Sequence, residues 1–173
     1  HTRFRNVTGV QTCALPILGD TQFAGLSTTQ VSGLTATQIA ALETTDLQAL
    51  TTTQVAGLST TQVKALSTTQ ITDLTDAQAA VLTGAQITAL SATQAAALDV
   101  TDFAAFTTTQ SAALTATQLG TLDATDLGSL STTNIALLST TQLKGLTATQ
   151  VGSLGDTQVL ALTETQKIGR AHV

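Results

Sequence analysis

The sequence predicts an all-α solenoid built from very short helices, one in each eight-residue repeat, and three observations lead to this prediction. A Leu recurs every eighth residue from Leu18 to Leu162, with one substitution by Phe106 and no insertion or deletion. The residue after each Leu is mostly Ser, Thr or Asp, and Gln usually follows three residues later. Val, Ile or Leu usually follows the Gln. We number octad positions from the Leu, so that the Gln is position 5 and the second aliphatic residue is position 6.

Each octad carries the signals of a helix start. Ser or Thr at position 2 followed by Gln at position 5, as in Ser27 and Gln30, matches the capping box, in which each side chain bonds to the backbone of the other residue. The aliphatic residues at positions 1 and 6, such as Leu26 and Val31, occupy the two places of a hydrophobic staple. We therefore expect a helix of one or two turns in each octad, beginning after position 2 and ending near the next Leu.

Two other conformations could accommodate the octad. In one uninterrupted helix, eight residues make about 2.2 turns, so the leucines would spiral around the axis and form no apolar stripe. A β-solenoid agrees with the strand preference of Thr and Val, but alternation would place positions 1 and 6 on opposite faces and Gln on the Leu face. The β-solenoid is the alternative fold.

Helices this short are unstable alone, because helix nucleation is costly. The octads must therefore stack, with positions 1 and 6 turned toward a shared axis and neighbouring repeats as each other's partners. Small residues before many of the leucines, such as Gly33 and Ala41, would let the backbones approach closely. An array of this kind that ends without polar caps exposes apolar faces, so end-to-end self-association is also expected.

Composition agrees with a thin, repeated core. Apolar residues make up 42% of the chain but aromatic residues only 2%, so small aliphatic side chains must form the interior. The net charge is -5, and the octads hold two bases, Lys64 and Lys144, against eleven acids, which argues against nucleic acid as a partner. No apolar run approaches the roughly 18 residues of a membrane span, so none is expected.

The two ends of the chain differ from the octads. The stretch VTGVQTCALPI near the start and the stretch KIGRAHV at the end resemble the translation of a common sequencing adapter. We therefore assign residues 1–17 and 167–173 as non-native flanks and residues 18–166 as the repeat, and we expect the natural protein to continue beyond both ends. The flanks hold Cys13, Pro16, both His and every Arg.

The octads from Leu18 to Gln166 resemble the Leu-(Ser/Thr)-x-x-Gln-(Val/Ile)-x-x arrays of large bacterial secreted or surface repeat proteins. The resemblance implies a bacterial, exported structural array with a secreted or cell-surface location. It supplies no catalytic residue.

No constellation for catalysis, metal binding or a cofactor stands out in the octads. Ser and Thr abound, but no His is present to act as a base, and equivalent hydroxyls recur in every repeat. Asp46, Asp102 and Asp126 take the Gln position, and Asp73 lies near Asp76, but none forms the dense oxygen loop that calcium requires. We expect no enzyme activity, no cofactor and no metal.

The remaining unusual residues fit structural roles. Lys64 and Lys144 are expected to be solvated charges. Phe103 and Phe106 stand at positions 6 and 1 of adjacent octads, so they are expected to fill a slightly larger core space.

The threonines at position 4 are the one candidate binding feature. In a regular solenoid they would form a ladder of hydroxyls able to bind an ordered surface such as ice or a polysaccharide. The candidate ladder consists of Thr29, Thr37, Thr45, Thr53, Thr61 and Thr69. The first functional hypothesis is a non-catalytic structural spacer or stalk segment of a larger bacterial exported protein, and the alternative is a repetitive surface-binding module that uses this ladder.

Overall fold

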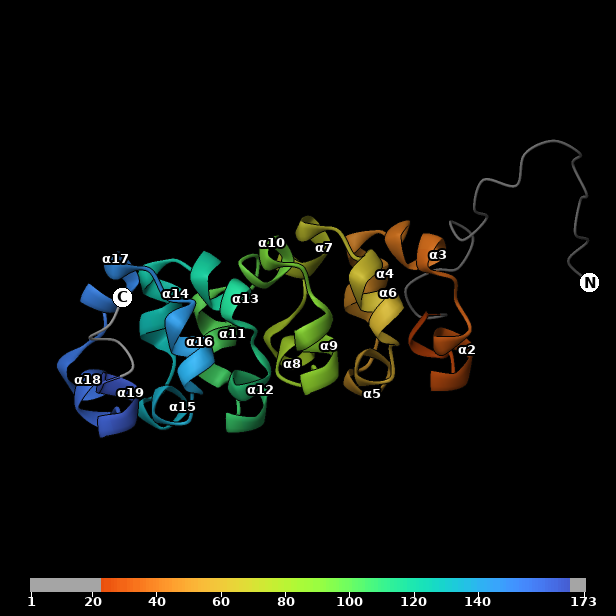
Figure 1. The fold of residues 1–173 in the computed structure, drawn as a ribbon. Coiled ribbons are helices and arrows are strands. Elements are labelled where there is room, and N and C mark those ends of the chain that lie inside the picture. Colours follow the sequence, from red (N-terminus) through yellow and green to blue (C-terminus); the bar gives the residue numbers. More distant parts are fainter. Residues whose placement is uncertain (1–22, 169–173) are drawn as a thin grey trace, which may run out of the picture.

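The computed structural model describes residues 23–168, and within that range the chain forms only short helices and their connections (Figure 1). The helices have four to six residues each. They are α2 (Thr28–Ser32), α3 (Ala36–Ala40), α4 (Thr44–Ala49), α5 (Thr52–Ala56), α6 (Thr60–Ala65), α7 (Thr68–Thr72), α8 (Asp76–Ala79), α9 (Gly84–Ala89), α10 (Ala92–Ala95), α11 (Val100–Ala105), α12 (Thr108–Ala113), α13 (Ala116–Thr121), α14 (Ala124–Ser129), α15 (Thr132–Ala136), α16 (Thr140–Lys144), α17 (Ala148–Gly152), α18 (Asp156–Ala161) and α19 (Glu164–Ile168). The predicted all-α solenoid is confirmed, and the β-solenoid alternative does not hold, since residues 23–168 contain no strand.

The backbone enters and leaves each helix as the octad pattern predicts. Ser27 has extended backbone angles (φ -70°, ψ 156°), and its hydroxyl accepts a hydrogen bond from the backbone N–H of Gln30. At the other end of a helix, Leu50 returns to extended angles (φ -64°, ψ 133°) and so ends α4. The residue after Leu50 is Thr51, which caps α5. In octads of this kind the Leu at position 1 ends one helix and precedes the cap of the next, whereas other helices end a residue earlier, as α2 does at Gly33.

Helices three apart along the chain pack against one another. The contacts run from α3 to α6, α9, α12, α15 and α18 in turn, and parallel series join the other helices. Hydrogen bonds between successive coils join residues 28 apart, such as Gln54 and Leu26, and 28 residues are three and a half octads. One coil of the solenoid thus takes about 3.5 octads, and Figure 1 shows the coils following one another along a single axis from α2 to α19.

Positions 1 and 6 form the core. Val31, Ile39 and Ile87 at position 6 are completely buried, and Leu50 at position 1 is also buried. These side chains belong to one cluster that runs through the described coils from Phe23 to Leu162. Burial of apolar surface stabilises each octad by roughly 1.5–3 kcal/mol per large side chain. The core is therefore continuous along the axis, as expected from the fixed spacing.

The core is less regular near its middle. Position 6 holds only small residues in three octads, as Ala79, Ala95 and Ser111. Phe103 and Phe106 lie in the same region, both buried, with their ring centroids 5.2 Å apart. Helix α11, which carries Phe103, packs on α8, which carries Ala79. The two aromatic side chains thus offset the volume that the small residues lack, and their expected role in a larger core space fits this packing.

Two glycines permit the closest approach between coils. A Cβ atom on Gly145 would lie 2.2 Å from the backbone oxygen of Ala116, and one on Gly120 would lie 2.6 Å from the backbone oxygen of Gly145. Helices α13 and α16 pack together at this point. A side chain at either position would push the two coils apart.

Candidate functional site

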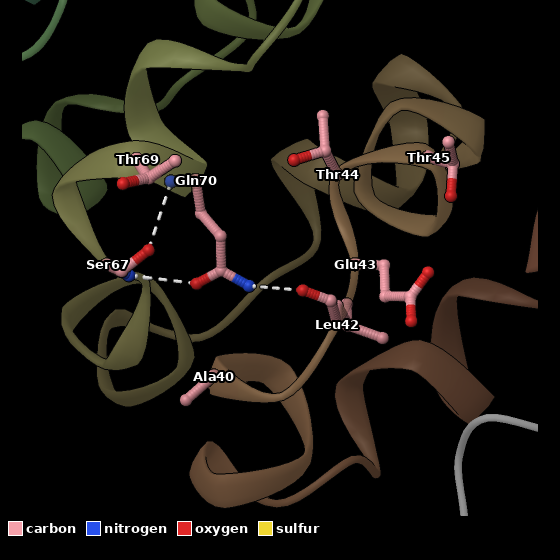
Figure 2. Close-up of a pocket in the computed structure, with 8 residues that line it drawn as sticks. All are labelled: Ala40, Leu42, Glu43, Thr44, Thr45, Ser67, Thr69 and Gln70. Carbon is pink, nitrogen blue, oxygen red and sulfur yellow. Dashed lines mark hydrogen bonds between the residues drawn. The ribbon is translucent and has the colours of Figure 1, made fainter.

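The Gln at position 5 closes the capping box that the sequence predicts. In the octad shown in Figure 2, the side-chain oxygen Oε1 of Gln70 accepts a 2.8 Å hydrogen bond from the backbone N–H of Ser67. The hydroxyl of Ser67 accepts a 3.1 Å bond from the backbone N–H of Gln70. Two N–H groups at the helix start, which have no partner within the helix, are satisfied in this way.

The amide nitrogen of the same side chain performs a second task. Nε2 of Gln70 donates hydrogen bonds to the backbone oxygens of Ile39 (3.1 Å) and Leu42 (2.9 Å), which belong to the preceding coil. Eleven other glutamines donate in the same way to carbonyls 28 to 31 residues upstream. We call the twelve side chains the glutamine ladder: Gln54, Gln62, Gln70, Gln78, Gln86, Gln94, Gln110, Gln118, Gln142, Gln150, Gln158 and Gln166.

The ladder lies inside the solenoid. Its side chains are between 1% and 7% exposed, so the amides donate to the carbonyls of the preceding coil from buried positions. An unsatisfied buried carbonyl or amide costs about 1–3 kcal/mol, so each ladder residue matters for both coils it touches. The octad pattern predicted the box but not this second bond. One signal was present, since Glu would close a capping box equally well yet never occupies position 5. Glu lacks the donor that the ladder requires.

The ladder is interrupted where position 5 is not Gln. Asn134 keeps one bond to the preceding coil, from Nδ2 to the backbone oxygen of Phe106 (2.8 Å). Asp102 accepts a bond from the backbone N–H of Asp99 through Oδ2, but its other oxygen, Oδ1, is buried without a partner. Burial raises the pKa of Asp102 to about 6, and the nearby charges of Asp99 and Asp76 add to the rise.

Asp126 is the equivalent residue of α14, which packs on α11. Burial raises the pKa of Asp126 as well, together with the charge of Asp123. Asp46 is the fourth residue to replace Gln. Asp102 closes its capping box with Asp99, but a carboxylate has no N–H and so cannot make the bond to the preceding coil that a ladder glutamine makes.

The six threonines of the candidate ladder are all exposed, and each is the second residue of its helix, from Thr29 in α2 to Thr69 in α7. Successive threonines lie on successive helices around the coil. Thr29 and Thr53 stand on helices in contact, and so do Thr37 and Thr61. A ligand role for these hydroxyls stays a prediction.

Thr45 and Thr69 share a shallow groove of about 510 Å³ (Figure 2). The groove is lined by Ala40, Leu42, Glu43, Thr44, Thr45, Ser67, Thr69 and Gln70. A second groove of about 500 Å³ lies along Gly128, Leu130, Ser131, Thr132, Ser153, Gly155, Thr157 and Gln158. Ala40 and Gly128 are 88 residues apart, as are Ser67 and Gly155, and this distance is eleven octads. The groove is thus a feature of the repeat, lined mainly by hydroxyl, amide and small groups.

Within residues 23–168 no group of three or more His, Cys, Asp or Glu residues is placed to hold a metal ion. Asp73 accepts a 2.6 Å hydrogen bond from the hydroxyl of Thr44 in the neighbouring coil. Lys64 and Lys144 are exposed, as expected.

The predicted flank 1–17 lies outside the described residues, and so does most of the flank 167–173.

Comparison with known proteins gives one similarity. Residues 39–76 match the family model described as the ALTTAQ repeat, which covers about a fifth of the chain and lies within the octads. Neither the curated proteins nor the solved structures that were compared gave a match. In the described range, no helix has both the length and the apolar character needed to cross a membrane. With its short periodic helices, the chain is a repeat-containing structural segment, and both the matched repeat and the fold are typical of a non-enzymatic module.

Proposed function

We propose that the chain is a non-catalytic spacer or stalk segment of a larger bacterial exported protein. The observation that carries the proposal is the glutamine ladder, because its twelve members repeat the same bonds to the preceding coil between Gln54 and Gln166, with other residues at only three positions in that range. A solenoid of this kind gains length with every added octad while its local structure stays the same. That property suits a segment whose task is to set a distance.

Bacterial export is supported by the resemblance of the octads to the arrays of bacterial secreted and surface proteins, so a secreted or surface location is part of the proposal. The two bases and eleven acids of the octads speak against nucleic acid as a partner. We also propose that copies of the chain associate end to end, a proposal supported by the exposed apolar side chains Val159 and Leu160 of α18, near the last described coil.

The spacer role is tested by adding coils. A second copy of residues 50–105, inserted after Ala105, adds 56 residues, which are seven octads and two coils. Small-angle X-ray scattering should show a longer particle with an unchanged cross-section. A flexible Gly/Ser insert of the same length at the same place is the control, and it should not lengthen the rod. A wider cross-section in place of a longer particle, or hydrolytic or transfer activity of the full chain on a substrate panel, would contradict the proposal.

A repetitive surface-binding module is the second candidate, favoured by the exposure of the six threonines and by the hydroxyl groups of the groove. Thermal hysteresis and a glycan array test it. Binding should weaken in the Thr45→Val, Thr69→Val variant, since Val keeps the shape of Thr but lacks the hydroxyl. The exposed Thr108, which stands at position 3 and lines neither groove, supplies the control Thr108→Val. Blank results in both assays would remove this candidate.

A further inference from the structure

Two junctions in the interior of the solenoid lack the bond that joins neighbouring coils elsewhere. From Leu26 to Leu138, all but two of the position 1 carbonyls accept a hydrogen bond from the side chain 28 residues downstream. The two exceptions are Leu74 and Leu98, and the residues 28 positions after them are Asp102 and Asp126. An ionised carboxylate has no N–H or O–H to donate, so these two carbonyls receive no link.

The side chain of Asp102 is one hydrogen atom short of a ladder side chain. Its Oδ2 accepts a 3.1 Å bond from the backbone N–H of Asp99, as the Oε1 atom of a ladder glutamine does from its own cap residue. The other oxygen, Oδ1, corresponds to the donating nitrogen of a glutamine. It is buried without a partner, in a side chain that is 6% exposed. A proton on Oδ1 would turn this acceptor into a donor.

Asn134 shows that so short a side chain can reach the preceding coil. Its Nδ2 donates a 2.8 Å bond to the backbone oxygen of Phe106, which lies 28 residues upstream. Asparagine and protonated aspartic acid have the same length and differ only in carrying an NH₂ or an OH group. The length of Asp102 is therefore sufficient for the same bond to Leu74.

The surroundings of Asp102 hold acids and no base. Helix α8 packs on α11 from one side and carries Asp76, and α14 packs from the other and carries Asp126. The caps of α11 and α14 are Asp99 and Asp123. The chain neighbours α10 and α12 have no charged residue. Burial, with the like charges around each group, raises the pKa of Asp102 to about 6 and raises that of Asp126. No cation here competes with a proton for either carboxylate.

We propose that Asp102 and Asp126 are proton-operated links between coils. When a proton from solvent binds the carboxylate, the new O–H donates to the position 1 carbonyl of the preceding coil and completes the ladder. When the proton leaves, the link is lost, while the cap of the helix stays. The junctions of α11 with α8 and of α14 with α11 are thus closed in acid and loosened at neutral pH. This inference goes beyond the spacer role and does not depend on it.

Four variants of the full chain test the links. Asp102→Asn supplies a permanent donor, and Asn134→Asp replaces a permanent donor with a proton-operated one. Asn134→Ala removes the donor altogether but keeps the bond from the backbone N–H of residue 134 to the hydroxyl of Ser131. The control Asp156→Asn removes an exposed carboxylate of α18. Circular dichroism verifies that each variant is folded.

Hydrogen–deuterium exchange at about pH 4.5 and about pH 7 gives the readout, expressed as protection factors so that the intrinsic pH dependence of exchange is removed. In the unchanged chain and in Asp156→Asn, the amides of α8 and α11 should be about tenfold more protected in acid. In Asp102→Asn they should have the acid level of protection at both pH values. Asn134→Asp should give α12 and α15 a new pH dependence, with protection in acid equal to that of the unchanged chain.

Two results would overturn the proposal. One is an Asp102→Asn variant whose α8 and α11 amides keep the pH dependence of the unchanged chain. The other is an Asn134→Asp variant that in acid is no better protected than Asn134→Ala, since the proton would then remove a charge without forming a link. Neither result bears on the length measurement that tests the spacer role.

Discussion

The stretch from α5 to α10 and the stretch from α11 to α15 have the same helices but different links between coils. In the first stretch every position 5 residue is a ladder glutamine, from Gln54 to Gln94. In the second, three of the five helices carry Asp102, Asp126 or Asn134 instead. The octad register continues unchanged through both, with helices of four to six residues in the first stretch and five or six in the second. The comparison separates two functions of one side chain, because the cap determines the helix and the amide joins the coils.

The difference predicts where the solenoid opens first. In the second stretch Asp102 leaves an oxygen without a partner, and the hydroxyl of Ser111 is likewise buried without one. Buried polar groups without partners lower the stability of the segment that contains them. The five predictions below test this comparison from the largest expected effect to the smallest.

A glutamate in the ladder of the first stretch should have the largest effect. Gln86→Glu keeps the oxygen that closes the box with Thr83 but turns a carboxylate toward the carbonyls of Val55 and Leu58. An uncompensated buried charge costs about 3–5 kcal/mol, so the free energy of unfolding should fall by that amount in urea denaturation. Gln30→Glu is the matched control, measured at a concentration where the chain is monomeric, and should change stability by less than about 0.5 kcal/mol. Equal losses in the two variants would show that the upstream bond has no special role.

Substitutions at the close approach between α13 and α16 test whether the stability of the second stretch depends on contact between the backbones of neighbouring coils. Gly145→Ala brings a Cβ atom against the backbone oxygen of Ala116 and should destabilise the chain by about 1–3 kcal/mol, as overpacking does. Gly128 lies within α14 with nothing within 4 Å of its Cβ position. Gly128→Ala should therefore stabilise by about 0.5–1 kcal/mol through helix propensity. Thermal melting of both variants measures the pair, and a stabilising Gly145→Ala would contradict the close approach.

The parts of the fold that depend on neighbours in sequence could be predicted, and the parts that depend on distant residues could not. The start of each helix follows from groups three residues apart, such as Ser27 and Gln30, and the register of the core follows from the fixed spacing of Leu. The number of octads in a coil depends on bonds between residues 28 apart, which no local pattern encodes. The position of each threonine around the coil also depends on these distant bonds. The sequence therefore predicted which helices carry the candidate threonines, but not whether their hydroxyls line up along the solenoid.

Restoring glutamine in the second stretch should strengthen it. Asp102→Gln supplies the amide donor that the carbonyls 28 and 31 residues upstream lack, and it removes a buried oxygen without a partner. The expected gain at pH 7 is about 1–3 kcal/mol in the free energy of unfolding. Asp126→Gln is the comparison variant, with a smaller gain expected because Asp126 is only half-buried.

The same substitution should change the dependence of stability on pH. The pKa of Asp102 is about 6 in the folded chain, above its ordinary value of 3.8, so folding favours the protonated form. Its contribution to stability is therefore complete below about pH 4 and is lost as the pH rises through 6. Denaturation between pH 4 and 7 should show this loss in the unchanged chain and a reduced loss in Asp102→Gln. A pH profile that the substitution leaves unaltered would assign the effect to other groups.

A smaller gain is expected at the other buried polar group of the second stretch. Ser111 stands at position 6, where most octads hold Val, Ile or Leu, and its hydroxyl has no partner. Ser111→Val removes that hydroxyl and adds apolar volume, so it should stabilise the chain by about 1 kcal/mol. Ser32, which is exposed, supplies the control Ser32→Val with an effect within about 0.5 kcal/mol. Destabilisation by Ser111→Val would instead mean that Phe103 and Phe106 already fill the space beside Ser111. The aromatic pair would then require a small residue at position 111, and the second stretch would be packed as tightly as the first.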